Sequence, residues 1–271
     1  MPPAESQDWI PAEINTEIPS AARIYDYLLG GGHNFKADRA IADQILKVQP
    51  NGREIALRNR AFLRRAVRFM LDEGVRQFLD LGSGIPTVGN VHEIAQKHSA
   101  GARVVYVDAE GVAVAHSQLM LDANPDAGIV HADILAPEDV LGAYYTRGLL
   151  DLSQPVGLLA ITIGHYLPPE RDPFGAFRRY RGALASGSFI ALTHLTNDFQ
   201  NVDAGGIVET MKSTQNNVFP RSKAEVLELV GDFELVPPGL VTTSRWRPDE
   251  MDDVPEDPQD DGLYAGVARK P

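Results

Sequence analysis

The sequence predicts a doubly wound α/β fold, in which helices cover both faces of a mostly parallel sheet of seven strands and a helical extension precedes the sheet. From residue 77 onward, short apolar runs alternate with segments of helical pattern. The apolar runs, such as VGLLAITI at 156–163, are continuous, as expected of strands buried on both faces. Acidic residues also close three successive runs, where open sheets bind ligands.

The alternation places each element in turn. Strands are expected at residues 77–81, 103–107, 128–131, 156–163 and 188–195, with helices between them at 88–97, 112–123, 138–147 and 169–184. Ser222, with Glu225 three residues later, forms a capping box that predicts another helix. A penultimate strand over 234–245 is interrupted by two prolines, and a last strand covers 263–268. The seven strands predict one Rossmann-like sheet.

The first 74 residues predict helices without strands. Two short helices, at 21–29 and 37–48, flank the glycine-rich run LLGGGHNF at 28–35. A long arginine-rich helix follows and ends at Gly74, a residue type typical of helix C-caps. We therefore expect an N-terminal helical extension, or lid, over residues 1–74 and a Rossmann-like domain over residues 75–271.

The bulk composition narrows the choice of partners. The chain of 271 residues has a formal net charge of −12, which disfavours nucleic acid and anionic membranes as partners. It contains no cysteine, which excludes disulfides and thiolate chemistry. The first residues are polar and proline-rich, and no apolar run approaches the roughly 18 residues of a membrane span. We expect a soluble cytoplasmic protein, and nothing here indicates its oligomeric state.

Two segments are strongly charged. Residues 249–261 contain eight acidic residues and no basic one, a pattern typical of a solvated loop. Residues 53–68 contain six arginines against a single glutamate. This arginine-rich face is either exposed to solvent or, in a second interpretation, lets Arg58 or Arg60 reach a bound anionic group.

The first strand ends in Asp80, Gly82, Ser83 and Gly84. Two glycines allow a tight turn and close contact between backbone and ligand. A dinucleotide site favours a third glycine where position 87 is threonine, and Asp80 is poorly placed beside a pyrophosphate. A cationic ligand such as S-adenosylmethionine removes this conflict.

The next two strands end in suitable acids. Asp108 can accept both hydroxyls of a ribose, each charge-assisted bond contributing about 1.5–3 kcal/mol. Asp133 can accept from an adenine amine while Ile134 packs on the ring. A single strand-final aspartate is usually a cap or loop residue, but three in succession predict a cofactor site.

These motifs resemble the class I S-adenosylmethionine-dependent methyltransferases, and more narrowly the actinobacterial S-adenosyl methyltransferase family, once a domain of unknown function. The resemblance runs from residue 22 to the C-terminus, through segments such as AARIYDYLLGGGHNFKADRA, RQFLDLGSGIPTVGNVHEIAQ and RVVYVDAEGVAVAH. It implies that Gly82–Gly84 contact the cofactor, Asp108 the ribose and Asp133 the adenine. Where the family usually has Asn-Asp-Pro after the ribose acid, this chain has Ala109-Glu110-Gly111, so Ala109 would offer only its backbone to the adenine edge.

For catalysis, His165 is the candidate residue, as a general base or as a group that orients the acceptor, because it follows the fourth strand where this fold presents residues beside the methyl group. The alternative is a purely structural hydrogen bond. His194, at the end of the fifth strand, is a weaker candidate. The histidines lack metal-ligand spacing, so no metal is expected.

The glycine-rich run is the candidate lid. Because no strand precedes it, a phosphate-binding role is excluded, and at least one glycine ends a helix. We expect Tyr25, His33, Asn34 and Phe35 to close the methionine end of the cofactor site, and residues 197–220 either to cover an acceptor pocket or to form a plain surface excursion.

The predicted function is methyl transfer from S-adenosyl-L-methionine to an unidentified acceptor. Because the negative net charge argues against nucleic acid, the acceptor is expected to be a small molecule or a protein side chain, and we favour a small molecule. Two alternatives stay open: a non-catalytic S-adenosylmethionine-binding protein, and a nicotinamide-dependent oxidoreductase, which Asp80 and the threonine at position 87 disfavour.

Overall fold

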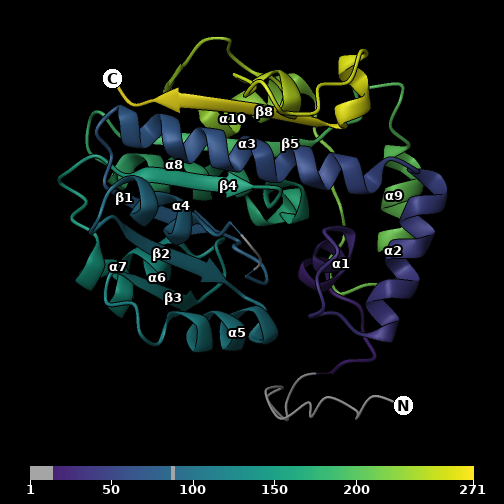
Figure 1. The fold of residues 1–271 in the computed structure, drawn as a ribbon, viewed down its shortest axis with the longest axis horizontal. Helices are drawn as coiled ribbons and strands as arrows, with labels where there is room; N and C mark the ends of the chain where they lie inside the picture. The colour runs from purple at the N-terminus through teal and green to yellow at the C-terminus, as the bar shows by residue number, and fades with distance from the viewer. Residues whose placement is uncertain (1–14, 87–88) are drawn as a thin grey trace.

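A computed structural model describes residues 15–86 and 89–271 and confirms the doubly wound α/β fold (Figure 1). The strands join in the order β3-β2-β1-β4-β5-β8-β6, with β7 also paired to β8. Their bounds are β1 Gln77–Leu81, β2 Arg103–Asp108, β3 Ala127–His131, β4 Gly157–Ile161, β5 Phe189–Leu195, β6 Glu234–Leu235, β7 Val241–Thr242 and β8 Leu263–Arg269. The first five strands are parallel and β8 is antiparallel to its neighbours.

The penultimate strand is two strands rather than one. β6 and β7 each pair with a different stretch of β8, and the chain leaves the sheet between them at Pro237 and Pro238. Proline has no backbone N–H to donate to a strand ladder, so the pairing is interrupted there. The sheet consequently has eight strands where the sequence predicts seven.

Helices follow the predicted order with local differences. Their bounds are α1 Ala21–Leu28, α2 Lys36–Val48, α3 Gly52–Asp72, α4 Val91–His98, α5 Gly111–Leu121, α6 Pro137–Gly142, α7 Tyr144–Leu149, α8 Pro173–Ala183, α9 Ala204–Met211 and α10 Lys223–Val230. The predicted helix over 138–147 is split at Ala143, which has extended backbone angles. The helix over 169–184 is interrupted at Asp172, whose φ is +53° and whose side chain caps α8. The predicted start of the fourth helix at Val88 lies outside the described residues.

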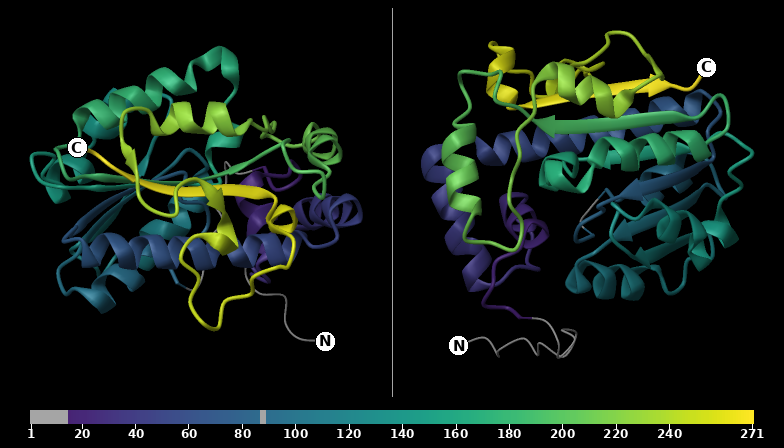
Figure 2. Two further views of the ribbon diagram at one scale, coloured as in Figure 1. Left: turned by 90° about the horizontal axis from the view of Figure 1, so that it is seen from above. Right: turned by 180° about the vertical axis from the view of Figure 1, so that it is seen from behind.

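Two layers of helices enclose the sheet (Figure 2). On one face, Phe62, Ala66 and Met70 of α3 pack with residues of α4 and α5 against β1, β2 and β4. On the other face, Phe177 and Leu229 belong to α8 and α10, which share a core with α6 and α7. Because α3 is buried against the sheet, the N-terminal segment is joined to the main core; the division at residue 74 itself stays a prediction.

A third apolar cluster lies beyond the ends to which the parallel strands point (Figure 1). It joins Ile24 of α1, Ile41 and Ile45 of α2, and Met211 and Val218 of the excursion after β5. The sequence did not predict α9 in that excursion, although Asp203 caps it by accepting from the Gly206 N–H at 2.8 Å. None of the helices in residues 15–86 and 89–271 has the length and apolarity needed to cross a bilayer.

The glycine-rich run is organised by a buried carboxylate. Gly30 ends α1 with a φ of +81°, which agrees with the predicted helix stop. The Asp26 side chain accepts from the His33 N–H and from Asn34 Nδ2, each at 2.8 Å. A Cβ on Gly31 would lie 2.0 Å from Asp26 Oδ1, so this glycine is needed for the carboxylate to fit.

The acidic segment and the arginine-rich helix bind each other. Arg64 and Arg68 pair with Asp249, Arg58 pairs with Asp253, and the buried Arg65 pairs with Asp252. Arg65 also donates to the carbonyl oxygens of Trp246 at 2.9 Å and Thr243 at 2.6 Å. The side chains of Arg64, Arg68, Asp249 and Asp253 are at least partly exposed to solvent, as the sequence predicts for charged segments. The sequence did not predict that opposite charges far apart in the chain meet on the surface of α3.

We expect Asp252→Asn to lower the free energy of unfolding by about 3 kcal/mol, because it leaves the buried Arg65 without its counter-charge. Asp253→Asn is the matched control: its carboxylate is 68% exposed, and its loss should cost at most about 1 kcal/mol. Urea denaturation of both variants measures the difference. Equal losses would contradict a special role for the Arg65 pair.

Candidate functional site

A cavity of about 530 Å³ opens at the carboxyl ends of β1 to β4. It lies where the strand order reverses between β1 and β4, the place at which doubly wound sheets bind ligands. α1 and residues 215–219 form the opposite wall. The volume is within the range of about 300–1,000 Å³ typical of small-molecule sites.

The turn after β1 forms the floor. Gly82 and Gly84 have φ values of +68° and +66°, a conformation that disfavours any side chain. A Cβ on Gly82 would lie 2.3 Å from Ile163 Cγ1. Gly82, Ser83 and Gly84 all line the cavity, as the sequence predicts. Thr87, the position where a dinucleotide fingerprint has glycine, lies outside the described residues.

Asp108 joins the turns after β1 and β2. Its Oδ2 accepts from the Gly84 N–H at 2.7 Å and its Oδ1 from the Glu110 N–H at 2.8 Å. Burial raises the pKa of Asp108, and the hydrogen bonds to its carboxylate oppose that rise. Each oxygen keeps a further lone pair, so the carboxylate can also accept from a ligand. Ala109 lines the cavity beside it.

Asp80 and Arg60 both lie on the cavity wall. Burial raises the pKa of Asp80 to about 7, while the positive charge of Arg60 opposes the rise. Arg60 donates to the Gly89 carbonyl oxygen at 2.8 Å, whereas Arg58 is bound to Asp253. Of the two arginines considered from sequence, Arg60 is the one at the site.

The end of β3 supplies Asp133 and Ile134, which both line the cavity. Asp133 Oδ1 accepts from the Leu135 N–H at 2.9 Å, and its Oδ2 pairs with Arg171 at 2.7 Å. Both members of this ion pair are partly exposed. The predicted adenine acid is thus present, with an arginine partner that the sequence did not suggest.

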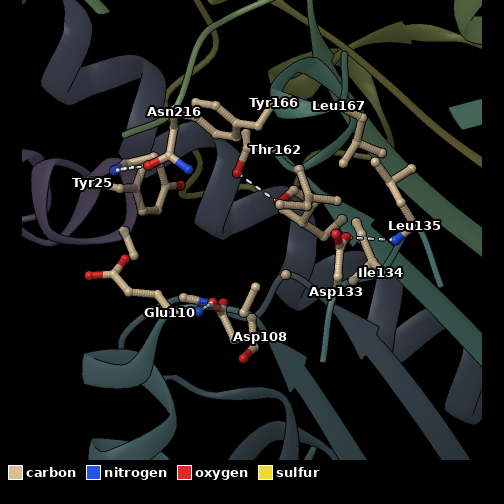
Figure 3. A pocket seen from close by; sticks show the side chains of 18 of the residues that line it. Tyr25, Asp108, Glu110, Asp133, Ile134, Leu135, Thr162, Tyr166, Leu167 and Asn216 are labelled. Atoms are coloured by element: carbon tan, nitrogen blue, oxygen red, sulfur yellow. Dashed lines mark hydrogen bonds between the residues drawn. The ribbon is translucent and has the colours of Figure 1, made fainter. Parts of the chain in front are cut away.

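Figure 3 shows how the polar side chains are divided. Asp108, Glu110 and Asp133 lie along one side of the open space, and Tyr25, Thr162, Tyr166 and Asn216 along the other (Figure 3). The labelled polar side chains of the first side are acidic and those of the second are neutral, while Arg60 and Arg171 also line the cavity.

Several residues on the neutral side have no sequence signal. Asn59, buried on α3, donates to the Tyr25 hydroxyl at 2.7 Å. Thr162 follows β4 with a φ of +53°, an outlier for a β-branched residue of the kind that clusters at functional sites. Its N–H donates to Thr193 Oγ1 at 2.9 Å, which helps to fix this conformation.

α1 is anchored over the cavity by its first turn. The Ser20 hydroxyl and Arg23 Nη1 donate to Glu110 Oε1 at 2.7 and 3.1 Å, and Arg23 Nε donates to Asp38 at 2.9 Å. The Ala21 N–H donates to Asn216 Oδ1 at 2.9 Å. Burial raises the pKa of Glu110 to about 7, while the hydrogen bond from Ser20 and the positive charge of Arg23 oppose this rise. α1, rather than the glycine-rich run that follows it, therefore forms this wall of the cavity.

Three of the predicted closing residues do not line this cavity. His33, Asn34 and Phe35 are turned toward other partners: Asn34 binds Asp26, and the His33 ring lies 4.3 Å from the His116 ring between centroids. The Asp26 carboxylate accepts hydrogen bonds from the His33 N–H and the Asn34 side chain, and these bonds hold the loop away from the cavity. Of the predicted closing residues, Tyr25 alone lies on the cavity wall.

His165 is buried in a second, smaller cavity next to the first. Its Nδ1 accepts from the Leu195 N–H at 3.3 Å, and burial, with the nearby His194 and Arg221, moves its pKa well below the usual range. His194 is also buried, with Nε2 3.0 Å from Arg221 Nη1. Within the described part of the chain, no group of His, Asp and Glu is arranged to hold a metal ion.

The comparisons with known proteins agree with this geometry. The sequence model of the S-adenosyl methyltransferase family matches residues 7–271. The chain belongs to this family. The resemblance carried by the sequence motifs is thereby confirmed, and S-adenosyl-L-methionine is the cofactor.

Two solved structures are similar over almost the whole chain. A DUF574 family protein from Streptomyces avermitilis is 37% identical, with a TM-score of 0.90 over 94% of this chain and 99% of that one. A proposed methyltransferase from Thermobifida fusca is 39% identical, with a TM-score of 0.89 over 97% and 98%. No curated protein sequence matches significantly.

A more distant structure has the same fold. The N-methyltransferase NodS from Bradyrhizobium japonicum, in complex with S-adenosyl-L-homocysteine, is 14% identical, with a TM-score of 0.50 over 92% of this chain and 99% of that one. The site residues of the present chain fit the cofactor: a glycine floor without side chains, and carboxylates facing a ligand that carries positive charge.

We expect Gly82→Ala to lower the free energy of unfolding by at least about 2 kcal/mol, because backbone strain and the clash with Ile163 combine. Gly30→Ala is the matched control, with a φ of +81° and no atom within 4 Å of the added Cβ, so it reports the backbone strain alone. In the Gly82→Ala/Ile163→Ala double variant, the losses should be smaller than the sum of the single ones. Additive losses in urea denaturation would contradict the clash.

Proposed function

We propose that the protein is an active methyltransferase that transfers the methyl group of S-adenosyl-L-methionine to a small-molecule acceptor. The observation that carries this proposal is the division of one cavity into an acidic side over the glycine turn and a neutral side against α1. The acidic side suits a cationic cofactor, and the neutral side leaves room for a second molecule.

The cofactor would be held by residues of four elements. Asp108 would accept from the ribose hydroxyls, and Asp133 and Ile134 would bind the adenine. Arg60 would pair with the carboxylate of the methionine part, and Asp80 would attract its positive groups. Asp133 could accept from the adenine amine while it stays paired with Arg171, or after the ion pair breaks. Breaking the pair would cost little, because both side chains are partly exposed.

When bound, the cofactor would supply an electrophilic methyl group: a lone pair of the acceptor would form the new bond to the methyl carbon, and the electrons of the broken carbon–sulfur bond would pass to sulfur. The residues of this chain would contribute mainly by positioning the two reactants in line and excluding water. Tyr25, Thr162 and Tyr166 face the space in which the acceptor would meet the methyl group.

His165 is better suited to orienting the acceptor than to taking its proton. Its low pKa makes it a weak base, and one ring nitrogen already accepts from the Leu195 N–H. In this proposal, the acceptor's proton leaves to solvent. If the His165→Gln variant binds the cofactor normally but loses turnover at all pH values, the result would instead support a role for His165 as the general base.

Calorimetric titration with S-adenosylmethionine tests the cofactor assignment. We expect binding by the wild type, and roughly 10–100-fold weaker binding by Asp108→Asn, because charge-assisted bonds to the ribose are lost. Asp139→Asn, an exposed position on α6, is the control and should bind normally. Binding of a nicotinamide cofactor in preference would support the oxidoreductase alternative, and binding with no methyl loss across a broad acceptor screen would support a non-catalytic role.

The affinity for S-adenosylmethionine should also depend on pH. Because the pKa of Asp80 is about 7 in the free protein, its carboxyl is increasingly ionised above pH 7 and protonated below it. A cationic ligand favours the ionised form, so binding should weaken as the pH falls, by up to about tenfold per unit.

Asp80→Asn should bind more weakly at pH 8 and lose most of this pH dependence. Glu110 has a similar pKa, so Glu110→Gln is measured in parallel. A slope that persists in Asp80→Asn and disappears in Glu110→Gln would contradict the role given to Asp80.

A further inference from the structure

A second cavity, of about 110 Å³, shares a wall with the cofactor cavity. Ala21, Tyr25, Thr162 and Tyr166 line both spaces. The second cavity extends among α1, α2, α3 and α9, in the apolar cluster beyond the sheet. It therefore adjoins the neutral side of the main cavity, away from the carboxylates of Asp108 and Asp133 (Figure 3).

The lining of this smaller cavity is apolar and uncharged. Its walls include Ile24, Ile45, Ile207, Met211 and Val218, and among the described residues no Asp, Glu, Lys or Arg contributes to it. Apolar cavities of this kind stay dry and accept apolar groups; one of about 150 Å³ can hold benzene.

Three of the polar side chains in the wall already have partners. Gln49 Oε1 accepts from the Asp203 N–H at 3.0 Å, and the Tyr25 hydroxyl lies between Asn59 and the Ala56 carbonyl oxygen, at 2.7 and 3.2 Å. His165 Nδ1 accepts from the Leu195 N–H. A ligand that entered this space would thus be recognised mainly by its apolar shape, with the Tyr166 hydroxyl and the edge of the His165 ring as additional polar groups.

We propose that the smaller cavity seats the apolar body of the methyl acceptor, with the acceptor's nucleophilic atom at the shared wall formed by Tyr25, Thr162 and Tyr166. The acceptor class is then an uncharged small molecule with a hydroxyl or amide-type group and a compact apolar end, such as a branched aliphatic chain. This inference rests on the methyltransferase function proposed above, because the cofactor must occupy the larger cavity.

The charged residues around the two cavities also favour an uncharged acceptor. An anionic acceptor would face Asp80, Asp108 and Glu110, and the two arginines of the main cavity would already be engaged, Arg60 by the carboxylate of the cofactor and Arg171 by Asp133. A cationic acceptor would find no carboxylate in the smaller cavity. Burial of an unpaired charge there would be strongly unfavourable.

Three probes with the same branched tail test the proposal: 3-methylbutan-1-ol, 3-methylbutanoate and 3-methylbutan-1-amine, titrated by NMR into protein saturated with S-adenosylhomocysteine. We expect the alcohol to bind in the millimolar range, at least about fivefold more tightly than the anion or the amine. Absence of alcohol binding, or equal or tighter binding of either charged probe, would overturn the proposal.

Val218→Phe, which fills the smaller cavity, should weaken alcohol binding at least about tenfold and leave S-adenosylhomocysteine affinity within about twofold. Val254→Phe, at a position 37% exposed and outside both cavities, is the matched control. Met211→Ala enlarges the same space and should improve binding of the bulkier 3,3-dimethylbutan-1-ol relative to wild type. If Val218→Phe fails to fold, the Met211→Ala variant decides the question. Binding of 3,3-dimethylbutan-1-ol by Met211→Ala that is no tighter than by the wild type would then overturn the proposal.

The two proposals fail in different ways. Wild-type protein that binds no S-adenosylhomocysteine would contradict the proposed function, and the alcohol titration on the free protein would still report on the smaller cavity. Normal cofactor binding without alcohol binding would contradict the acceptor class alone.

Discussion

The site depends on one carboxylate that connects parts of the chain distant in sequence. Asp108 accepts from Gly84 on one side and from Glu110 on the other, so the turns after β1 and β2 are fixed to each other. Glu110 in turn accepts from Ser20 and Arg23. Through these contacts, the position of α1 over the cavity depends on the same strand ends that would bind the cofactor.

Burial gives this arrangement its electrostatic character. Desolvation raises the pKa of Asp80, Asp108 and Glu110. Arg60 opposes the rise at Asp80, backbone hydrogen bonds oppose it at Asp108, and Ser20 and Arg23 oppose it at Glu110. A cluster of buried carboxylates is unfavourable in the free protein, because each charge repels the others and has lost water. A ligand with positive charge relieves this cost, which explains how an acidic cavity can select a sulfonium cofactor.

Sequence reasoning located the part of the site that is built from strand ends. Asp80, Gly82, Gly84, Asp108 and Asp133 each follow a recognisable strand, and the topology of a doubly wound sheet brings those ends together. The predicted mostly parallel sheet is confirmed, and the penultimate strand, predicted with an interruption at Pro237 and Pro238, is divided there into two short strands.

The rest depends on contacts that no local pattern encodes. His33, Asn34 and Phe35 look like a lid in sequence, but the buried Asp26 binds their loop away from the cavity. Thr162 adopts a left-handed conformation that periodicity cannot indicate, and the chain after it carries His165 into the second cavity. Asn59 is the one uncharged polar side chain of α3, a helix whose sequence pattern is dominated by arginines.

The most direct test of this account is a crystal structure of the protein with S-adenosylhomocysteine. The account predicts the ribose hydroxyls on Asp108, the adenine beside Asp133 and Ile134, and the amino-acid part over Gly82 near Arg60, with the smaller cavity free of cofactor atoms. A cofactor that lies outside the β1–β4 cavity, or that places its adenine in the apolar space behind Tyr25, would contradict it.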